Sequence, residues 1–155
     1  MAGHRDISNI VVEDAHIMFR NFSGKESMYN KAGVRGFSLR IDDEAFAQKL
    51  SQDGWNVKIL APREGDDTVR HHLPVAVNYA NVPPMVYLVT KRNKTLLDEA
   101  TIETLDYAEI VTVDLTITPY QWQLPTGQSG VKAYLKTMYV TIEEDEFAHK
   151  YDDFE

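Results

Sequence analysis

The chain has 155 residues, of which 43% are hydrophobic and 26% are charged, and its formal net charge is −8. This length allows one domain with a buried core, and the composition excludes a wholly disordered, collagen-like or coiled-coil protein. The absence of cysteine excludes disulfide scaffolds, cysteine-ligated zinc sites and thiol nucleophiles.

The first ten residues are polar, and no apolar run approaches the roughly 18 residues that span a bilayer. We therefore expect no membrane association and a cytoplasmic location.

The negative charge is concentrated at the C-terminus. Of 24 acids and 16 bases, residues 143–155 hold seven acids and one base, which leaves 17 acids and 15 bases in residues 1–142. Residues 16–40 have the opposite balance, with five bases against Glu26. A basic N-terminal third and an acidic end indicate separate electrostatic roles for the two regions.

Strand patterns dominate the first half of the chain. Residues 17–22 and 37–42 alternate apolar and polar side chains, and a glycine-containing loop separates them. Residues 43–54 predict a helix that Asp42 or Asp43 caps and Gly54 ends. Further strands are expected at 55–61, 73–79 and 85–90. A short helix is expected at 101–109, opened by a weak capping box of Thr101 and Thr104.

Two long strands are predicted at 111–122 and 131–142, joined by a hairpin at 125–130. In the first strand, strict alternation puts four apolar residues on one face: Val111, Val113, Leu115 and Ile117. In the second, Val131, Ala133 and Leu135 share a face. Six or seven strands with one or two short helices predict a mainly β protein built as a small closed or nearly closed barrel.

The outward face of the last strand has the residue types that bind nucleic acid. Lys132, Tyr134 and Lys136 would place a ring between two cations, as single-stranded DNA requires for its bases and phosphates. We expect Tyr120 and Trp122 to extend this row, together with residues near the N-terminus. These are Arg20, Phe22, Lys25, Tyr29, Lys31, Arg35 and Phe37. The alternative is a solubilising strand face, with Trp122 covering one end of the barrel.

Other motifs do not support catalysis. Ser23-Gly24-Lys25-Glu26 lacks the first glycine and the Ser or Thr of a phosphate-binding loop. His71 and His72 are adjacent, so on a strand they point to opposite faces and cannot chelate one metal. A two-metal nuclease site remains an alternative, with candidate ligands Asp42, Asp43, Asp66, Asp67 and Asp114.

Two segments resemble tailed-phage single-stranded DNA-binding proteins. One runs from Arg20 to Lys25, with Tyr29-Asn30 and residues 33–39 after it, and the other is residues 130–140, followed by acids. The resemblance implies a barrel of the oligonucleotide-binding (OB) type, sequence-independent binding of single-stranded DNA in phage replication or recombination, no catalytic centre, and no metal or other cofactor.

The acidic end is similar to the partner-binding tails of single-stranded DNA-binding proteins. We expect residues 1–142 to form the DNA-binding domain and residues 143–155 a flexible tail. The tail would reach replication or recombination proteins through Tyr151, Asp152, Asp153 and Phe154. It departs from the bacterial pattern because Glu155 follows the aromatic residue and no proline precedes it.

Two other functions stay open at this point. The net acidity would suit a non-enzymatic phage interaction protein, such as a host-enzyme inhibitor or DNA mimic, and the aspartates would suit the metal-dependent nuclease. The sequence sets no oligomeric state, and a homodimer is compatible with it.

Overall fold

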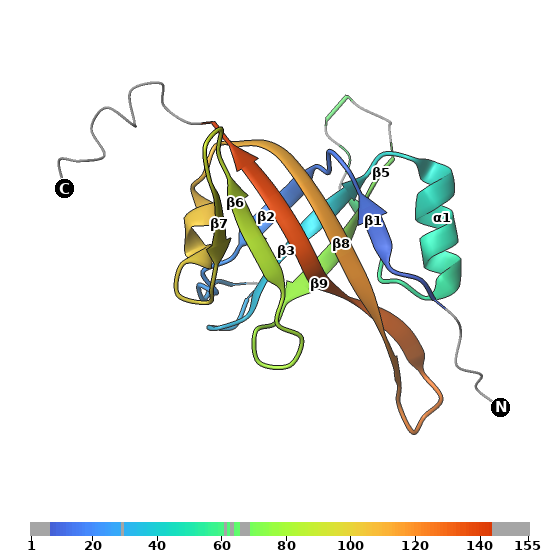
Figure 1. The fold of residues 1–155 in the computed structure, drawn as a ribbon. Coiled ribbons are helices and arrows are strands. Elements are labelled where there is room, and N and C mark those ends of the chain that lie inside the picture. The colour runs from blue at the N-terminus through green and yellow to red at the C-terminus, as the bar shows by residue number, and fades with distance from the viewer. Residues whose placement is uncertain (1–6, 29, 61, 63, 66–68, 144–155) are drawn as a thin grey trace.

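The computed structural model describes residues 7–28, 30–60, 62, 64–65 and 69–143. Strands make up most of this part of the chain (Figure 1). In order, the elements are β1 (Ile10–Val12), β2 (Ile17–Asn21), β3 (Arg35–Ile41), α1 (Glu44–Asp53), β4 (Lys58–Leu60), β5 (Arg70–Val77), β6 (Met85–Val89), β7 (Lys94–Leu97), the 3₁₀ helix η1 (Ile102–Asp106), β8 (Ile110–Gln123) and β9 (Ser129–Ile142).

The strands form one sheet whose main path is β1-β8-β9-β5-β3-β2. The chain passes directly from β1 at one end of this path to β2 at the other, so the N-terminal segment links the two ends. In this link, Ala15 N donates to Val113 O and Arg40 N donates to His16 O. The β5–β9 pair is parallel, whereas β2–β3, β3–β5 and β8–β9 are antiparallel. The result is a mainly β, partly open OB-like barrel, as predicted.

The remaining elements attach to this barrel. β4 pairs with β5, and β6 lies between β7 and β9. The predicted helix is confirmed as α1: the Asp43 side chain accepts hydrogen bonds from Ala45 N and Phe46 N, and Gly54 ends the helix with φ 99°. None of the helices in the described part of the chain has the length and hydrophobicity needed to cross a bilayer.

The structure differs from the local predictions in three respects. The sequence patterns missed the short strands β1 and β7, and the strand predicted at 55–61 contains only β4. The capping box is absent, because Thr101 makes no side-chain cap bond. Its hydroxyl instead donates to Asp98 Oδ1 at 2.9 Å, which closes a turn before η1.

β8 and β9 form the predicted long hairpin, with two irregularities. Val113, Leu115 and Ile117 of β8 are buried, as are the three predicted core residues of β9, Val131, Ala133 and Leu135. The prediction for Val111 is wrong, because a register shift between Ile110 and Thr112 leaves it unpaired and exposed. A second shift, between Thr116 and Ile117, leaves Lys136 as an extra residue in β9.

Candidate nucleic-acid interface

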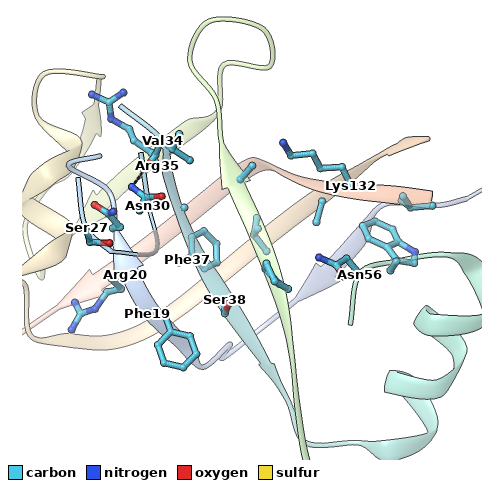
Figure 2. A pocket seen from close by; sticks show the side chains of 18 of the residues that line it. Phe19, Arg20, Ser27, Asn30, Val34, Arg35, Phe37, Ser38, Asn56 and Lys132 are labelled. Atoms are coloured by element: carbon cyan, nitrogen blue, oxygen red, sulfur yellow. Dashed lines mark hydrogen bonds between the residues drawn. The ribbon is translucent and has the colours of Figure 1, made fainter. Parts of the chain in front are cut away.

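A groove of about 1230 Å³ crosses the outer face of β3 and β5. Its floor is made of small residues that pair across the two strands, Gly36 with Ala76 and Ser38 with Pro74. Gly36 cannot be larger, because a Cβ there would lie 2.7 Å from Val75 O. Figure 2 shows Phe19, Arg20 and Arg35 on one side of this floor and Asn56 and Lys132 on the other.

Phe19 projects from β2 into the first wall of the groove. The β2–β3 register shifts between Met18 and Asn21, and within this bulge Phe19 has φ 53°, which is unusual for a bulky residue. Phe19 is 65% exposed, and its ring stands edge-on to His72, with 5.5 Å between the ring centroids. Strained backbone of this kind occurs at functional sites, and here it presents a phenyl ring to the groove.

His72 supports the floor beneath this ring. Its Nδ1 lies 3.0 Å from the Ser38 hydroxyl. Burial, and to a smaller extent the charge of Lys58, lower the pKa of His72 below its usual value of 6.5. The imidazole is therefore mainly neutral at pH 7.

The loop between β2 and β3, residues 22–34, is held in shape by asparagines. Asn21 Oδ1 accepts a hydrogen bond from Lys25 N, and Asn30 Nδ2 donates to the carbonyl oxygens of Lys25, Lys31 and Val34. Gly33 N donates to Gly24 O across the base of the loop. The loop therefore needs little ordering to serve as a wall of the groove.

η1 and the residues after it anchor this loop. The Asp106 carboxylate accepts from Phe22 N at 2.6 Å and Ser23 N at 3.0 Å. Arg20 Nη1 donates to the carbonyl oxygens of Leu105 and Ala108. The loop and η1 therefore form one unit.

Tyr107, directly after η1, adds an aromatic ring to this wall. It is 73% exposed, and its hydroxyl accepts a 2.9 Å hydrogen bond from Lys25 Nζ. This hydrogen bond, with the negative charges nearby, raises the pKa of Lys25 and keeps its ammonium protonated. A ring and a cation thus stand together at the groove.

The second wall comes from residues 54–56, directly after α1, and from the β8–β9 hairpin. Trp122 lies over Gly130, where a Cβ would be only 2.7 Å from the indole ring. Lys132 is exposed, and its Nζ lies 5.2 Å from the Tyr134 ring centroid. The Tyr120 ring meets Tyr134 edge-on at 6.0 Å. Aromatic rings and cations therefore flank the floor on both sides.

This arrangement agrees with the sequence comparisons. The profile of a protein family described as "Putative phage ssDNA-binding domain" matches residues 2–155. The chain belongs to this family. No match was found among curated proteins.

Solved structures of phage single-stranded DNA-binding proteins share the fold of this phage ssDNA-binding domain. One is a C-terminal truncation of the single-stranded DNA-binding protein from bacteriophage Enc34. It has 11% identity and a TM-score of 0.51, over 88% of this chain and 87% of that chain. Another is the single-stranded DNA-binding protein from bacteriophage Enc34, with 14% identity and a TM-score of 0.50, over 95% of this chain and 90% of that chain.

The groove of the phage ssDNA-binding domain brings together six of the twelve residues predicted to bind nucleic acid. Those that line it are Arg20, Lys25, Arg35, Phe37, Trp122 and Lys132. Tyr120 and Tyr134 lie beside Lys132 on the outer face of the hairpin, whereas Lys31 and Lys136 are exposed elsewhere. Tyr29, Tyr151, Asp152, Asp153 and Phe154 lie outside the described residues.

Phe22 and Phe37 are corrections to the predicted set. Phe22 is fully buried and Phe37 is 4% exposed, and their rings pack together with centroids 5.5 Å apart. The bulge in β2 breaks the alternation on which the prediction for Phe22 rested, so that Phe19 takes the outward position. Both buried rings support the floor from the core and cannot stack on bases.

Arg20 and Arg35 line the groove but are held by protein groups. Arg20 binds the two carbonyls near η1, and Arg35 Nη1 forms a 3.1 Å salt bridge with Glu99. Lys25 and Lys132 are consequently the cations most available to phosphates at the groove. No salt bridge joins either of them to another described residue.

Sequence reasoning missed Phe19, Tyr107 and the small residues of the floor. The alternation within residues 17–22 could have placed Phe19 on the outward face only if the bulge in β2 had been known. Tyr107 lies 82 residues from Lys25, so no sequence spacing connects the two.

Three of the aspartates proposed as metal ligands have separate structural tasks. Asp43 caps α1, Asp42 pairs with Arg40, and Asp114 accepts a hydrogen bond from Asp14 N. Asp66 and Asp67 lie outside the described residues. Among the residues that are described, no three histidines or acids are grouped as metal ligands would be.

Proposed function

We propose that this chain binds single-stranded DNA in the groove across β3 and β5, without sequence preference, during phage DNA replication or recombination. The observation that carries the proposal is the pair of walls: Phe19 and Tyr107 stand on one side of a floor of small residues, with Trp122 and Lys132 on the other. OB folds bind oligonucleotides on one sheet face, between the loops that flank it. Here that face is the floor of β3 and β5, and the flanking segments are the β2–β3 loop and the β8–β9 hairpin.

The expected energetics follow from these residue types. An exposed ring stacks on any base, at about 1–3 kcal/mol per base, so sequence preference should be weak. Lysines at the walls neutralise phosphates and release counterions, so affinity should fall with salt. This function is binding without catalysis, and it requires no metal or other cofactor.

We also propose that the chain divides into a DNA-binding domain and an acidic tail. Residues 1–142 would form the binding domain. The acidic residues 143–155 would form a tail that contacts a replication or recombination protein through Tyr151, Asp152, Asp153 and Phe154. The charge difference between the two segments supports this division.

A titration of fluorescein-labelled oligo-dT, followed by anisotropy with single- and double-stranded competitors, tests the proposal. Neutralisation of about three to five phosphates gives a slope of about −0.7 per phosphate when log affinity is plotted against log salt. Equal affinity for duplex DNA, or an affinity that does not respond to salt, would contradict it. Degradation of the oligonucleotide on addition of magnesium would favour the nuclease instead.

A further inference from the structure

A second cluster of aromatic rings and a cation lies on the outer face of the sheet, away from the groove. Tyr87 of β6 and Tyr139 of β9 are direct neighbours in the parallel β6–β9 pair, and their rings stack at 4.9 Å with 12° between the planes. Lys94 Nζ of β7 lies 5.0 Å from the Tyr87 centroid and 5.9 Å from the Tyr139 centroid. None of these three residues belongs to the groove.

Strand β9 connects this cluster to the groove. Its outward residues begin with Lys132 at the groove wall, continue through Tyr134, and reach Tyr139. The extra residue at Lys136 resets the alternation, so that Met138 and Val140 face the core and Tyr139 faces outward. At about 3.3 Å per residue, this row extends roughly 20 Å beyond the groove wall.

The row also has the charge that a nucleic acid needs. Lys94, Lys132 and Lys136 are exposed, and none of them forms a salt bridge with another described residue. Asp114 of β8 is the acid directly opposite Tyr139 in the β8–β9 pair. Its Oδ1 accepts a hydrogen bond from Asp14 N.

We propose that the outer face of β9, from Lys132 to the Tyr87–Tyr139–Lys94 cluster, is a second track for single-stranded DNA that leaves the groove. This inference rests on the proposed function, since the track continues the groove. It makes the cluster a contact for longer strands only, with the rings meeting bases and Lys94 meeting a phosphate.

A second copy of the chain is a less suitable occupant of this face. Exposed apolar residues, Met85 and Leu96, do flank the cluster. A symmetric dimer through the same face, however, would bring Lys94, Lys132 and Lys136 of both copies together, and the like charges would repel. A polyanion removes that repulsion, so charge favours DNA.

The experiment compares two oligonucleotides with the full chain. A short oligo-dT of about 6 nucleotides fits within the groove, and a long one of about 20 nucleotides can also reach the cluster. We expect Tyr139→Ala and Lys94→Ala each to weaken binding of the long oligonucleotide, by about tenfold for the ring, while binding of the short one is unchanged. Tyr139→Phe keeps the ring and should bind both as the wild type does.

The outcomes separate this inference from the proposed function. Long-strand affinity that neither Tyr139→Ala nor Lys94→Ala reduces would overturn the track alone, as would an equal loss for both lengths. Wild-type protein that binds neither oligonucleotide would overturn the groove as well. Lys94 is exposed, so its variant remains informative even if Tyr139→Ala fails to fold. A dimer that Leu96→Ala dissociates, with unchanged DNA affinity in all variants, would assign the face to a second copy.

Discussion

Lys25 Nζ donates a 2.9 Å hydrogen bond to the Tyr107 hydroxyl and lies 5.7 Å from the centroid of the same ring. The two residues come from elements 82 positions apart, the loop after β2 and the end of η1. Because the hydrogen bond raises the pKa of Lys25, the ammonium stays charged beside an exposed ring. The proposed function assigns one nucleotide to this pair, with the ring as its stacking surface and the ammonium as its phosphate contact.

Replacing Tyr107 separates these two contributions. Tyr107→Ala removes the ring and should cost about 1–3 kcal/mol of binding free energy for oligo-dT. Tyr107→Phe keeps the ring and loses only the hydrogen bond, so it should cost less than about 1 kcal/mol. Anisotropy titrations measure both losses, and equal losses would show that the ring does not stack on a base.

Phe19 should show opposite effects on stability and on binding. Phe19→Gly removes the ring and also suits the positive φ, so the free energy of unfolding should stay constant or rise by up to about 1 kcal/mol. Its DNA affinity should fall as much as that of Phe19→Ala, which removes the ring but keeps the strain. Urea denaturation and anisotropy measure the two quantities. Wild-type affinity in Phe19→Gly would exclude Phe19 from the interface.

Phe22 should behave as a core residue. Phe22→Ala should lower the free energy of unfolding by about 3–5 kcal/mol, because it empties a fully buried site beneath the groove. Phe22→Leu keeps most of the volume and should fold and bind DNA nearly as the wild type does. A stable Phe22→Leu protein with greatly weakened binding would instead restore the stacking role that the sequence suggested.

The sequence predicted those features that depend on local alternation and capping. Asp43 and Gly54 mark the ends of α1, and Val131, Ala133 and Leu135 mark the core face of β9. These residues act within one element, where the helical or strand period decides which way a side chain points. The mainly β barrel followed from them.

The errors come from bulges and from contacts between distant segments. Because of one extra residue in β2, Phe19 faces outward and Phe22 faces the core. Another extra residue, in β8, leaves Val111 exposed. Since a shift of one residue turns a side chain to the opposite face, a single bulge reverses the prediction. Arg20 contacts η1 and the residues after it through backbone carbonyl groups. Because every residue carries a carbonyl group, no sequence pattern reveals this contact.

Removal of residues 149–155 should tighten DNA binding at low salt. This segment adds three acids, Asp152, Asp153 and Glu155, against one base, Lys150, and so repels phosphates or competes with them for the cations of the groove. The gain should shrink as salt rises, because screening weakens both effects. Titrations at two salt concentrations measure it, and unchanged or weaker binding at low salt would leave the segment without a role in DNA binding.

Amide chemical-shift mapping determines where on the protein the DNA binds. In ¹H–¹⁵N spectra of the labelled protein, a short oligo-dT should shift the amides of Gly36, Ser38 and Ala76 on the floor and of Tyr107 and Lys132 on the walls. Saturable shifts at these five positions, with little change in α1, are the predicted result. Shifts that leave the floor of β3 and β5 unchanged would place the DNA outside the groove.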